Sequence, residues 1–477
     1  MSAPDVIVVG GGLAGLSAAV GLARRDIRVL VLEARGRLGG RASAFRDPTT
    51  GELVDNGQHV LLGCYHATFR YLRAIGADTA VRMQASLEVP TIDREGRLTT
   101  LCCPALPSPL HLLAGVMRWA ALSATDRLRV LRVAPAIWYA RRAMARGSKD
   151  PLTQGETVEA WLSRHGQGGR LGELLWEPLA LAALNQPIGH AAAEPFVRVL
   201  GAVFGTDPRD AAIALPTRPL DEALAEPARR FVESRGGEVR TNALARIHLA
   251  DGQVTDVVIR GETLPARVVI AAVPWHDLGG VFEGDTDLIG DVLACARTTS
   301  PSPIVTVNLW FDRAVLDVPF VGLPGRVMQW VFDKRWAFGR AASHLSLVSS
   351  GAEAVLRRSN DDLIALALDE VREALPVARQ ARLDHALVVR EPRATFSIAP
   401  GQPARPSTAT RVGGLLLAGD WVDTRLPATI ESAVLSGEWA AEAALRGFAG
   451  SDLDSMHPTR HPRLGSGLLR GVHKIKI

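Results

Sequence analysis

Three glycines and one carboxylate near the start of the chain have the spacing of a phosphate-binding turn. Gly10, Gly12 and Gly15 form a Gly-x-Gly-x-x-Gly pattern, and Glu33 follows 18 positions after Gly15. In such a pattern the first glycine permits a tight turn, the second lets a pyrophosphate approach the backbone, and the third lets a helix pack on a strand. The carboxylate would accept a hydrogen bond from a ribose hydroxyl. The spacing therefore predicts dinucleotide binding.

The elements that must position these residues can be recognised on both sides of the glycines. Residues 5–9 are a short apolar run typical of a buried parallel strand, residues 13–25 have helical spacing, and residues 28–32 predict a second strand. Leu13 and Ala14 would begin the helix, where backbone N–H groups bind phosphate. Strand, helix, strand and acid together form the context in which the glycine pattern binds a dinucleotide.

A second glycine-rich stretch distinguishes the kind of dinucleotide. The sequence from Glu33 to Arg41 is Glu-Ala-Arg-Gly-Arg-Leu-Gly-Gly-Arg. It resembles the second dinucleotide signature of the flavin amine oxidoreductase superfamily, which includes monoamine oxidases and carotenoid desaturases. A flavin that crosses the sheet needs backbone and an arginine close to its phosphates. The resemblance implies FAD, with Ala34, Arg35, Gly40 and Arg41 among its contacts.

The far end of the chain completes the resemblance. An apolar run ends in Gly419-Asp420, and a helix rich in small residues is predicted over residues 429–445. The Asp420 carboxylate could hold hydroxyls of the ribityl or pyrophosphate side. The helix, from Ile430 onward, could direct its N-terminal dipole at the carbonyl end of the flavin. By resemblance Val239 would cover the adenine through its backbone, although an ordinary strand valine is an equal reading.

Residues 55–65 indicate a narrower family. This stretch, Asp-Asn-Gly-Gln-His-Val-Leu-Leu-Gly-Cys-Tyr, resembles the squalene-associated, FAD-dependent desaturase-like family, the hydroxysqualene dehydroxylases of hopanoid biosynthesis. Shorter matches lie at residues 176–179, 390–396 and 421–424. The resemblance implies a hydrophobic isoprenoid substrate, reduction of hydroxysqualene to squalene, and NADPH as electron donor. A second glycine pattern for NADPH is not evident in the sequence.

Two alternatives stay open. An oxidative enzyme of the same fold, either a carotenoid or phytoene-type desaturase or another flavin amine oxidoreductase, would use FAD to abstract hydride. A prenyl-lipid escort protein would use the fold without flavin. The complete phosphate pattern argues against the escort protein. Covalent flavin attachment is not expected, because the last cysteine, Cys295, precedes the C-terminal motif by more than a hundred residues.

Three titratable residues lie in segments expected near the flavin. Hydroxide is a poor leaving group, so a positioned acid must protonate it while flavin delivers hydride. Asp55, His59 and Asp423 are the candidates. His59 is preferred because an imidazole of ordinary pKa, about 6.5, is suited to proton donation near neutrality. A purely structural histidine is the alternative.

These segments predict a discontinuous α/β (α+β) architecture. A Rossmann-type FAD-binding domain would comprise residues 1–85, 225–280 and 385–450, with a substrate domain of mixed structure and a helical part inserted as residues 86–224 and 281–384. Residues 451–477 would form a basic, mobile tail. Asp251-Gly252, between two apolar runs, predicts a hairpin with a type I′ turn.

Composition and charge limit the partners. The 477 residues are 47% hydrophobic and 22% charged, which excludes a disordered chain. A net charge of +4 is too small to indicate nucleic acid. Residues 101–149 nevertheless carry a local charge of +7 among tryptophan and leucine, which predicts either peripheral contact with a membrane or a solvated cap over the substrate cavity.

The cysteines and apolar runs limit the location. The four cysteines form no CxxC pair and no zinc pattern, so we expect no metal and a reducing, cytoplasmic setting. A stretch of about 20 apolar residues, as a spanning helix needs, is lacking. The protein is therefore expected in the cytoplasm, with a peripheral position on the inner face of the cell membrane as the further possibility. Its oligomeric state is left open.

Overall fold

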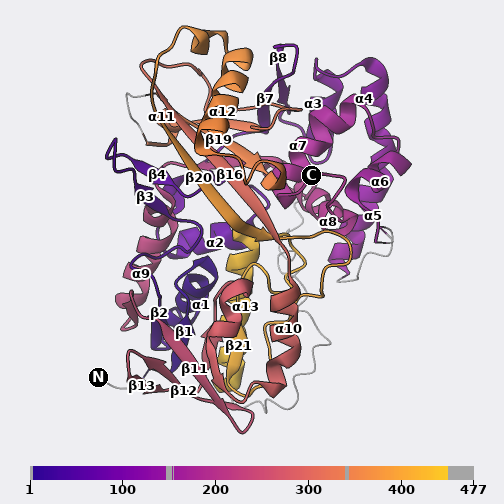
Figure 1. Ribbon diagram of the computed structural model, residues 1–477. Coiled ribbons are helices and arrows are strands. Elements are labelled where there is room, and N and C mark those ends of the chain that lie inside the picture. The colour runs from indigo at the N-terminus through magenta and orange to yellow at the C-terminus, as the bar shows by residue number, and fades with distance from the viewer. Residues whose placement is uncertain (1–3, 147–152, 154, 339–342, 449–477) are drawn as a thin grey trace, which may run out of the picture.

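The computed structural model describes residues 4–146, 153, 155–338 and 343–448 (Figure 1). The predicted tail at 451–477 and the last residues of the basic segment, 147–149, lie outside the described residues.

A five-stranded parallel sheet forms the dinucleotide-binding part and confirms the predicted α/β class. Its order is β10 (Glu238–Arg240), β2 (Val29–Leu32), β1 (Val6–Val9), β14 (Val269–Ala271) and β21 (Leu415–Leu417). The strands come from three segments that are far apart in the sequence. The exact boundaries of the two domains stay a prediction.

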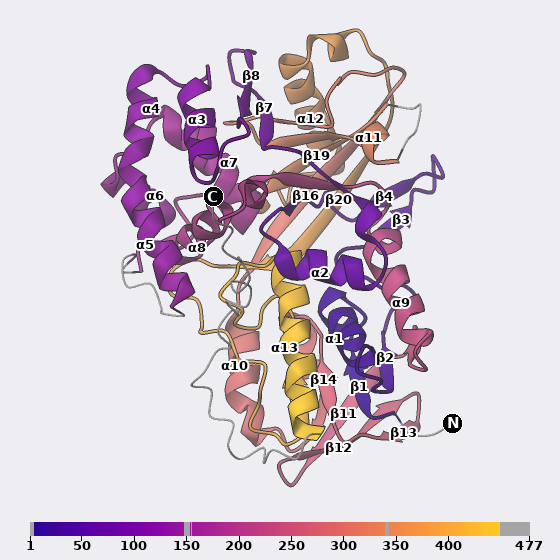
Figure 2. The same ribbon diagram turned by 180° about the vertical axis from the view of Figure 1, so that it is seen from behind.

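The alternation of side chains along β1 explains how both faces of this sheet are covered. Val6 and Val8 pack with the helices α1 (Leu13–Ala23) and α13 (Ile430–Phe448), which lie side by side in both views (Figures 1 and 2). A Cβ atom at Gly437 of α13 would lie 2.2 Å from the Ala14 carbonyl oxygen, so only glycine allows the two helices to approach this closely. The first and last helices therefore share one face of the sheet.

The opposite face is covered by a sheet of four strands. Its order is β13 (Glu262–Pro265), β12 (Gln253–Ile259), β11 (Ala245–Ala250) and β15 (Phe282–Gly284). Ile247 and Val257 belong to the same core as Ile7 and Val9 of β1. Asp251 and Gly252 have φ of 50° and 72°, as a type I′ turn requires, which confirms the predicted hairpin.

A seven-stranded sheet forms the backbone of the substrate part. Its order is β20 (Leu383–Phe396), β16 (Pro301–Phe311), β19 (Ser343–Ser350), β18 (Trp330–Asp333), β17 (Phe320–Gly322), β7 (Glu88–Ile92) and β8 (Leu98–Cys102). The helix α12 (Asn360–Ala374) covers one face through Leu363, Ala367 and Val371. The short helix α11 (Lys334–Phe338) follows β18.

A layer of helices stands beside this sheet and forms one edge of the molecule (Figures 1 and 2). Its members are α3 (Leu110–Arg118), α4 (Ala124–Val130), α5 (Ala134–Ala145), α6 (Val158–Arg164), α7 (Glu177–Leu184) and α8 (Ala193–Val203). A π-helical turn, Gly172–Trp176, precedes α7. Within the described residues, no helix is both long and apolar enough to cross a membrane.

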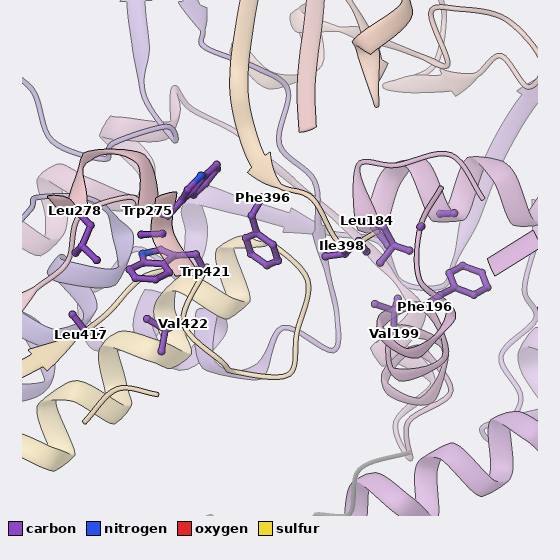
Figure 3. Packing of buried hydrophobic residues seen from close by; sticks show 14 of the residues in the cluster. Leu184, Phe196, Val199, Trp275, Leu278, Phe396, Ile398, Leu417, Trp421 and Val422 are labelled. Carbon is purple, nitrogen blue, oxygen red and sulfur yellow. The ribbon is translucent and has the colours of Figure 1, made fainter. Parts of the chain in front are cut away.

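Smaller elements connect these layers. They are α2 (His66–Ala74), α9 (Glu226–Glu233), α10 (Gly290–Thr298), the pair β3 (Ala44–Arg46) and β4 (Leu53–Asp55), and the sheet β5 (Leu61–Leu62), β9 (Ile213–Pro216), β6 (Val81–Met83). One apolar core continues from the dinucleotide-binding part to the helices (Figure 3). In it the rings of Trp275 and Phe396 meet edge to face, with 6.4 Å between their centroids.

Candidate active site

One large cavity lies between the parallel sheet and the seven-stranded sheet. Its volume is about 1000 Å³, at the upper end of the roughly 300–1,000 Å³ typical of ligand sites. The β1–α1 turn and residues 56–60, 419–420 and 428–430 line one end, whereas helices α3, α5 and α7 and strands β17–β19 line the other. The glycine-rich motifs and the inserted substrate part therefore meet at a single site.

The glycine turn has the geometry that a bound phosphate needs. A Cβ atom at Gly12 would have no heavy atom within 4 Å, so the backbone there faces open space in the cavity. Gly12 caps α1 without a side-chain hydrogen bond, and Leu13 and Ala14 of the first turn also line the cavity. At Gly15, in contrast, a Cβ atom would lie 2.0 Å from the Gly10 carbonyl oxygen. Gly15 thus packs the helix on the strand while Gly12 leaves room for the ligand.

Glu33 lies at the end of β2, as the motif requires, and is 9% exposed. Its Oε2 accepts from Gly11 N at 2.8 Å, and its Oε1 accepts from Arg35 N at 2.8 Å. Each oxygen has a second lone pair, so the carboxylate is held rigidly and can still accept from a sugar hydroxyl.

Arg41 and Asp420 join the two ends of the chain at the cavity wall. Arg41 Nη2 lies 2.6 Å from Asp420 Oδ1, and Arg41 Nη1 donates to the Ala394 carbonyl at 2.7 Å. Asp420 is 5% exposed, and its carbonyl accepts from Ser432 Oγ in the first turn of α13. Arg41, which the resemblance places near the phosphates, therefore also neutralises the Asp420 carboxylate.

His59 lines the cavity on the loop after β4. Its Nδ1 lies 2.8 Å from the Gly57 carbonyl oxygen, which can only accept, so Nδ1 carries the proton and Nε2 keeps a lone pair in the neutral ring. Burial lowers the pKa of the imidazole below its ordinary value, although the Gly57 carbonyl and Asp55 oppose this. The charges of Lys334 and Arg41 lower it further. The ring is therefore mostly neutral at pH 7.

A buried ion pair holds the loop that carries His59. Lys334 Nζ lies 2.8 Å from Asp55 Oδ2 and donates to Gln58 Oε1 at 2.8 Å. Asp55 Oδ1 also accepts from Leu220 N. The side chains of Lys334 and Asp55 are 4% and 6% exposed, and neither lines the cavity. Asp55 thus lies behind the cavity wall, where it positions the loop through Lys334.

The family model for the flavin containing amine oxidoreductases matches residues 13–445, nearly the whole described chain. The chain belongs to this family. The matched region includes Glu33 and the Arg41–Asp420 pair, for which a cofactor role stays a prediction. The protein is accordingly a flavin-dependent oxidoreductase.

Several known proteins are similar to this chain over most of their length. It is 29% identical to a hydroxysqualene dehydroxylase of Sinorhizobium fredii and 31% identical to one of Rhodopseudomonas palustris, with 92% of this chain and 98% of the relative covered in both cases. A 15-cis-phytoene desaturase of Glycine max is 25% identical, with 93% of this chain and 79% of the relative covered. These matches confirm the resemblance that the sequence predicts.

A solved structure confirms the fold. An oxidoreductase from Methanosarcina mazei superimposes with a TM-score of 0.72 at 16% identity, covering 92% of this chain and 99% of that protein.

The residues present fit the FAD that the flavin amine oxidoreductase family implies. Gly12 offers an open cradle at a helix N-terminus, and Glu33 and Arg35 face the same cavity. Ala34, Gly40, Gly419 and Ile430 line it as well. The four cysteines, all within the described residues, lie outside the cavity lining, in keeping with noncovalent binding.

Two predicted residues lie elsewhere. Val239 in β10 does not line the cavity, whereas residues 243–246 just after it do. Asp423 is also outside the lining; its side chain is 44% exposed, and its Oδ1 lies 3.3 Å from Arg405 Nη2. Asp423 is therefore poorly placed to act on a ligand in the cavity.

Two polar residues that line the cavity, Asn56 and Glu391, are not among the site residues predicted from the sequence. Asn56 Nδ2 donates to Glu391 Oε2 at 3.1 Å, and both residues line the cavity. They are 335 positions apart, so spacing could not relate them. The sequence does distinguish Lys334, because lysine occurs only four times in the chain. Its ion-pair partner, Asp55, is apparent only from the three-dimensional structure.

Proposed function

We propose that this flavoprotein reductively removes the hydroxyl group of hydroxysqualene to give squalene, in the biosynthesis of hopanoids or related triterpenoids. The observation that carries the proposal is the apolar end of the cavity, which joins the FAD end directly. The hydroxysqualene dehydroxylases that match over 98% of their length support it.

The cavity walls suit a long hydrocarbon. Leucine, valine, isoleucine and aromatic side chains of the helices and of β17–β19 form most of the lining beyond the flavin end, including Trp119, Ile137, Trp176, Phe320 and Phe332. Contact with such a surface stabilises an apolar ligand by about 25 cal/mol for each Å² removed from water. A polyisoprenoid gains more from this lining than a small polar amine would.

The few polar residues near the loop after β4 would recognise the hydroxyl end. His59, Asn56 and Glu391 line the cavity there. Bound FAD in its reduced form supplies a hydride, and NADPH is the proposed source of the electrons. The balance is R–OH plus hydride plus one proton giving R–H plus water, so the protein must deliver a proton to the departing oxygen. We assign this to His59, which would hold the hydroxyl through Nε2 and donate when protonated.

A desaturase acting on a carotenoid precursor is the second candidate. The observation in its favour is the match to phytoene desaturase over 93% of this chain. It would use the same apolar cavity and the same FAD in the oxidative direction, with hydride leaving the substrate. A proton donor to oxygen would then have no role.

The two candidates differ in the oxidation state of the flavin that reacts. Purified holoprotein, reduced anaerobically by dithionite, is incubated with hydroxysqualene and the products are analysed by mass spectrometry. We expect squalene and oxidised flavin in equal amounts. A parallel incubation of oxidised protein with phytoene should give no desaturated product. Flavin that stays reduced with hydroxysqualene, or desaturation of phytoene, would contradict the proposal.

A further inference from the structure

The outer helices α3 to α5 carry an unusual density of exposed apolar side chains. Of the twelve large apolar residues that are exposed within the described part of the chain, seven lie between residues 106 and 139. They are Leu106, Leu110, Met117, Leu128, Leu131, Trp138 and Tyr139. Leaving such residues in water is unfavourable, and a cluster of them is typical of an interaction surface.

Their spacing puts several of them on one helical face. Residues 124–145 form an almost unbroken helical run, in which α4 passes into α5 through a single 3-10 turn. Leu128, Leu131 and Trp138 are three and seven residues apart and therefore lie on one side of this run. They are 58%, 41% and 54% exposed. The run thus presents an apolar stripe to the outside.

Positive charge surrounds this stripe. Residues 101–146 contain seven arginines and one acid, Asp126, which pairs with Arg129. Arg132 and Arg142 are exposed, and the Arg142 guanidinium lies 3.8 Å from the centre of the Trp138 ring. Arginine beside tryptophan and leucine suits a boundary between anionic headgroups and hydrocarbon. An anionic bilayer offers a partner for each, with headgroups for the arginines and hydrocarbon for the apolar stripe.

The stripe adjoins the cavity described above. Leu131 and Trp138 are exposed, yet both also line the cavity, as do Ile137 on the inner side of α5 and Arg141 one turn on. The apolar end of the cavity therefore reaches the surface between the same side chains that form the stripe. A ligand that leaves a hydrocarbon layer there would pass into the cavity without crossing water.

We propose that the outer face of α3 to α5 binds an anionic lipid bilayer, and that the cavity opens into this bilayer between Leu131 and Trp138. Binding to the bilayer does not depend on the function proposed above. The entry role does rest on it, because it assumes a substrate dissolved in the membrane.

Vesicle cosedimentation of the holoprotein, without substrate, tests the surface. The probes are vesicles of phosphatidylcholine with about 30% phosphatidylglycerol, and phosphatidylcholine alone. We expect binding to the anionic vesicles that weakens as salt rises from about 0.05 M to about 0.5 M, because the Debye length shortens. Arg129→Gln, Arg132→Gln and Arg142→Gln together should weaken it about 100-fold, at about fivefold for each basic residue. These three avoid Arg127, which donates to the Trp119 carbonyl inside the fold.

Matched variants test whether vesicle binding depends on this surface or only on the net charge and exposed apolar residues of the protein as a whole. Arg24→Gln, Arg25→Gln and Arg73→Gln remove the same charge from exposed positions at the ends of α1 and α2 and should leave binding unchanged. Leu128→Ser with Tyr139→Ser, neither of which lines the cavity, should weaken binding at least tenfold. Leu288→Ser with Val377→Ser, exposed elsewhere, should not.

Three outcomes would overturn the proposal: no binding to anionic vesicles, equal loss in the control variants, or a surface that joins two copies of the chain. The last would appear in analytical ultracentrifugation as a dimer that Leu128→Ser with Tyr139→Ser dissociates. Turnover then tests entry separately. If variants that lose vesicle binding convert detergent-dispersed substrate normally but vesicle-dissolved substrate slowly, entry from the bilayer is supported; equal turnover from both sources would contradict it. If no form converts hydroxysqualene from either source, the proposed function fails while the vesicle result stands.

Discussion

Glu33 shows how the fold holds in place a side chain that is predicted to bind the cofactor. Backbone N–H groups of Gly11 and Arg35 already hold both of its oxygens, so no rotamer freedom is lost when a sugar hydroxyl binds. Asp420 is fixed in the same way by Arg41. Preorganisation of this kind favours tight binding, because the cost of ordering the side chain is met during folding.

Replacement of Glu33 by Ala should therefore release FAD. A lost hydrogen bond to a charged group costs about 1.5–3 kcal/mol, which is roughly a 10- to 100-fold weaker affinity. Flavin content is measured by absorbance after extensive dialysis. Glu233→Ala, at an exposed carboxylate near the end of α9, is the control and should retain FAD fully. A Glu33→Ala protein with unchanged flavin content would refute the proposed sugar site.

The lowered pKa of His59 gives the reaction a predicted pH dependence. Only the protonated ring can donate, and its pKa lies below the ordinary value of about 6.5. The protonated fraction therefore already falls through the neutral range, so the single-turnover rate should drop about tenfold from pH 7 to pH 8. The measurement is reoxidation of reduced flavin by hydroxysqualene in a stopped-flow instrument.

Substitution at the same position checks the assignment. His59→Ala should keep FAD, because Gly12, Glu33 and Arg41, the residues predicted to hold it, are unchanged, and should slow the reaction by about 100- to 10,000-fold. His190→Ala, at an exposed histidine, should react as the wild type does. Near-normal turnover by His59→Ala, or a flat rate between pH 7 and pH 8, would remove His59 from proton transfer.

The helices α2 and α13 are joined by a buried carboxylate that belongs to neither the cofactor nor the substrate. Glu431, in the first turn of α13, accepts from Ala67 N and Thr68 N at 2.9 Å each, at the start of α2. N–H groups in the first turn of a helix have no partner within the helix, and here the Glu431 carboxylate provides one. The contact fixes α2, which follows the His59 loop, against the helix whose N-terminus lines the cavity.

Loss of this contact should destabilise the whole protein. Glu431→Ala leaves two buried N–H groups without partners, at about 1–3 kcal/mol each, and should lower the midpoint of denaturant unfolding. Glu438→Ala is a matched control on the same helix, because Glu438 also pairs with α2, through Arg70, but at a partly exposed site. A surface pair contributes only about 0–1 kcal/mol. Equal effects of the two substitutions would contradict the assignment.

The elements that could be predicted from the sequence are those whose sequence patterns lie within one short segment. The strand at Val6–Val9, the helix from Leu13 and the turn at Asp251 and Gly252 follow from periodicity and from residues that tolerate positive φ. The contacts that sequence could not predict join distant segments. Nothing local to Asp420 indicates that Arg41, 379 positions away, takes up its charge.

The same reason limits how precisely site residues can be placed from the sequence. The resemblance predicts a contact at Val239, whereas the residues of this segment that line the cavity are 243–246, after the end of β10. The pKa of His59 depends on burial and on Lys334 from another part of the chain, neither of which a single sequence records. Residue types were thus predictable, whereas their electrostatic surroundings were not.

Across the whole molecule, one buried ion pair joins the seven-stranded sheet to the two-stranded β3–β4 sheet. Lys334, at the end of β18 in the seven-stranded sheet, reaches Asp55 at the end of β4, beside the FAD end of the cavity. Taking both charges out of water is costly, so this pair contributes less to stability than its short distance suggests. Its value is that it fixes the two parts in one relative position.

Replacing one partner of the Lys334–Asp55 pair should destabilise the protein more than replacing both. Lys334→Met leaves the buried Asp55 charge uncompensated and should cost about 3–5 kcal/mol in the free energy of unfolding. Lys334→Met with Asp55→Leu should recover most of this loss, which denaturant unfolding of the two variants measures. Arg382→Gln, which breaks an exposed pair with Asp384, should have almost no effect. A double variant no more stable than Lys334→Met would contradict the account.

The parallel sheet that carries the glycine turn is completed by β21, close to the end of the chain, and α13 then covers it. During synthesis at about 5–20 residues per second, roughly 20–80 s separate the emergence of β1 from that of α13. The edge of β14 is unpaired from the emergence of β14 until that of β21, and the side of α1 that packs on α13 is bare throughout the longer interval. A ribosome that stalls before residue 415 would therefore release a chain with an aggregation-prone sheet edge, and FAD could not protect it, because Asp420 and the α13 terminus would not yet exist.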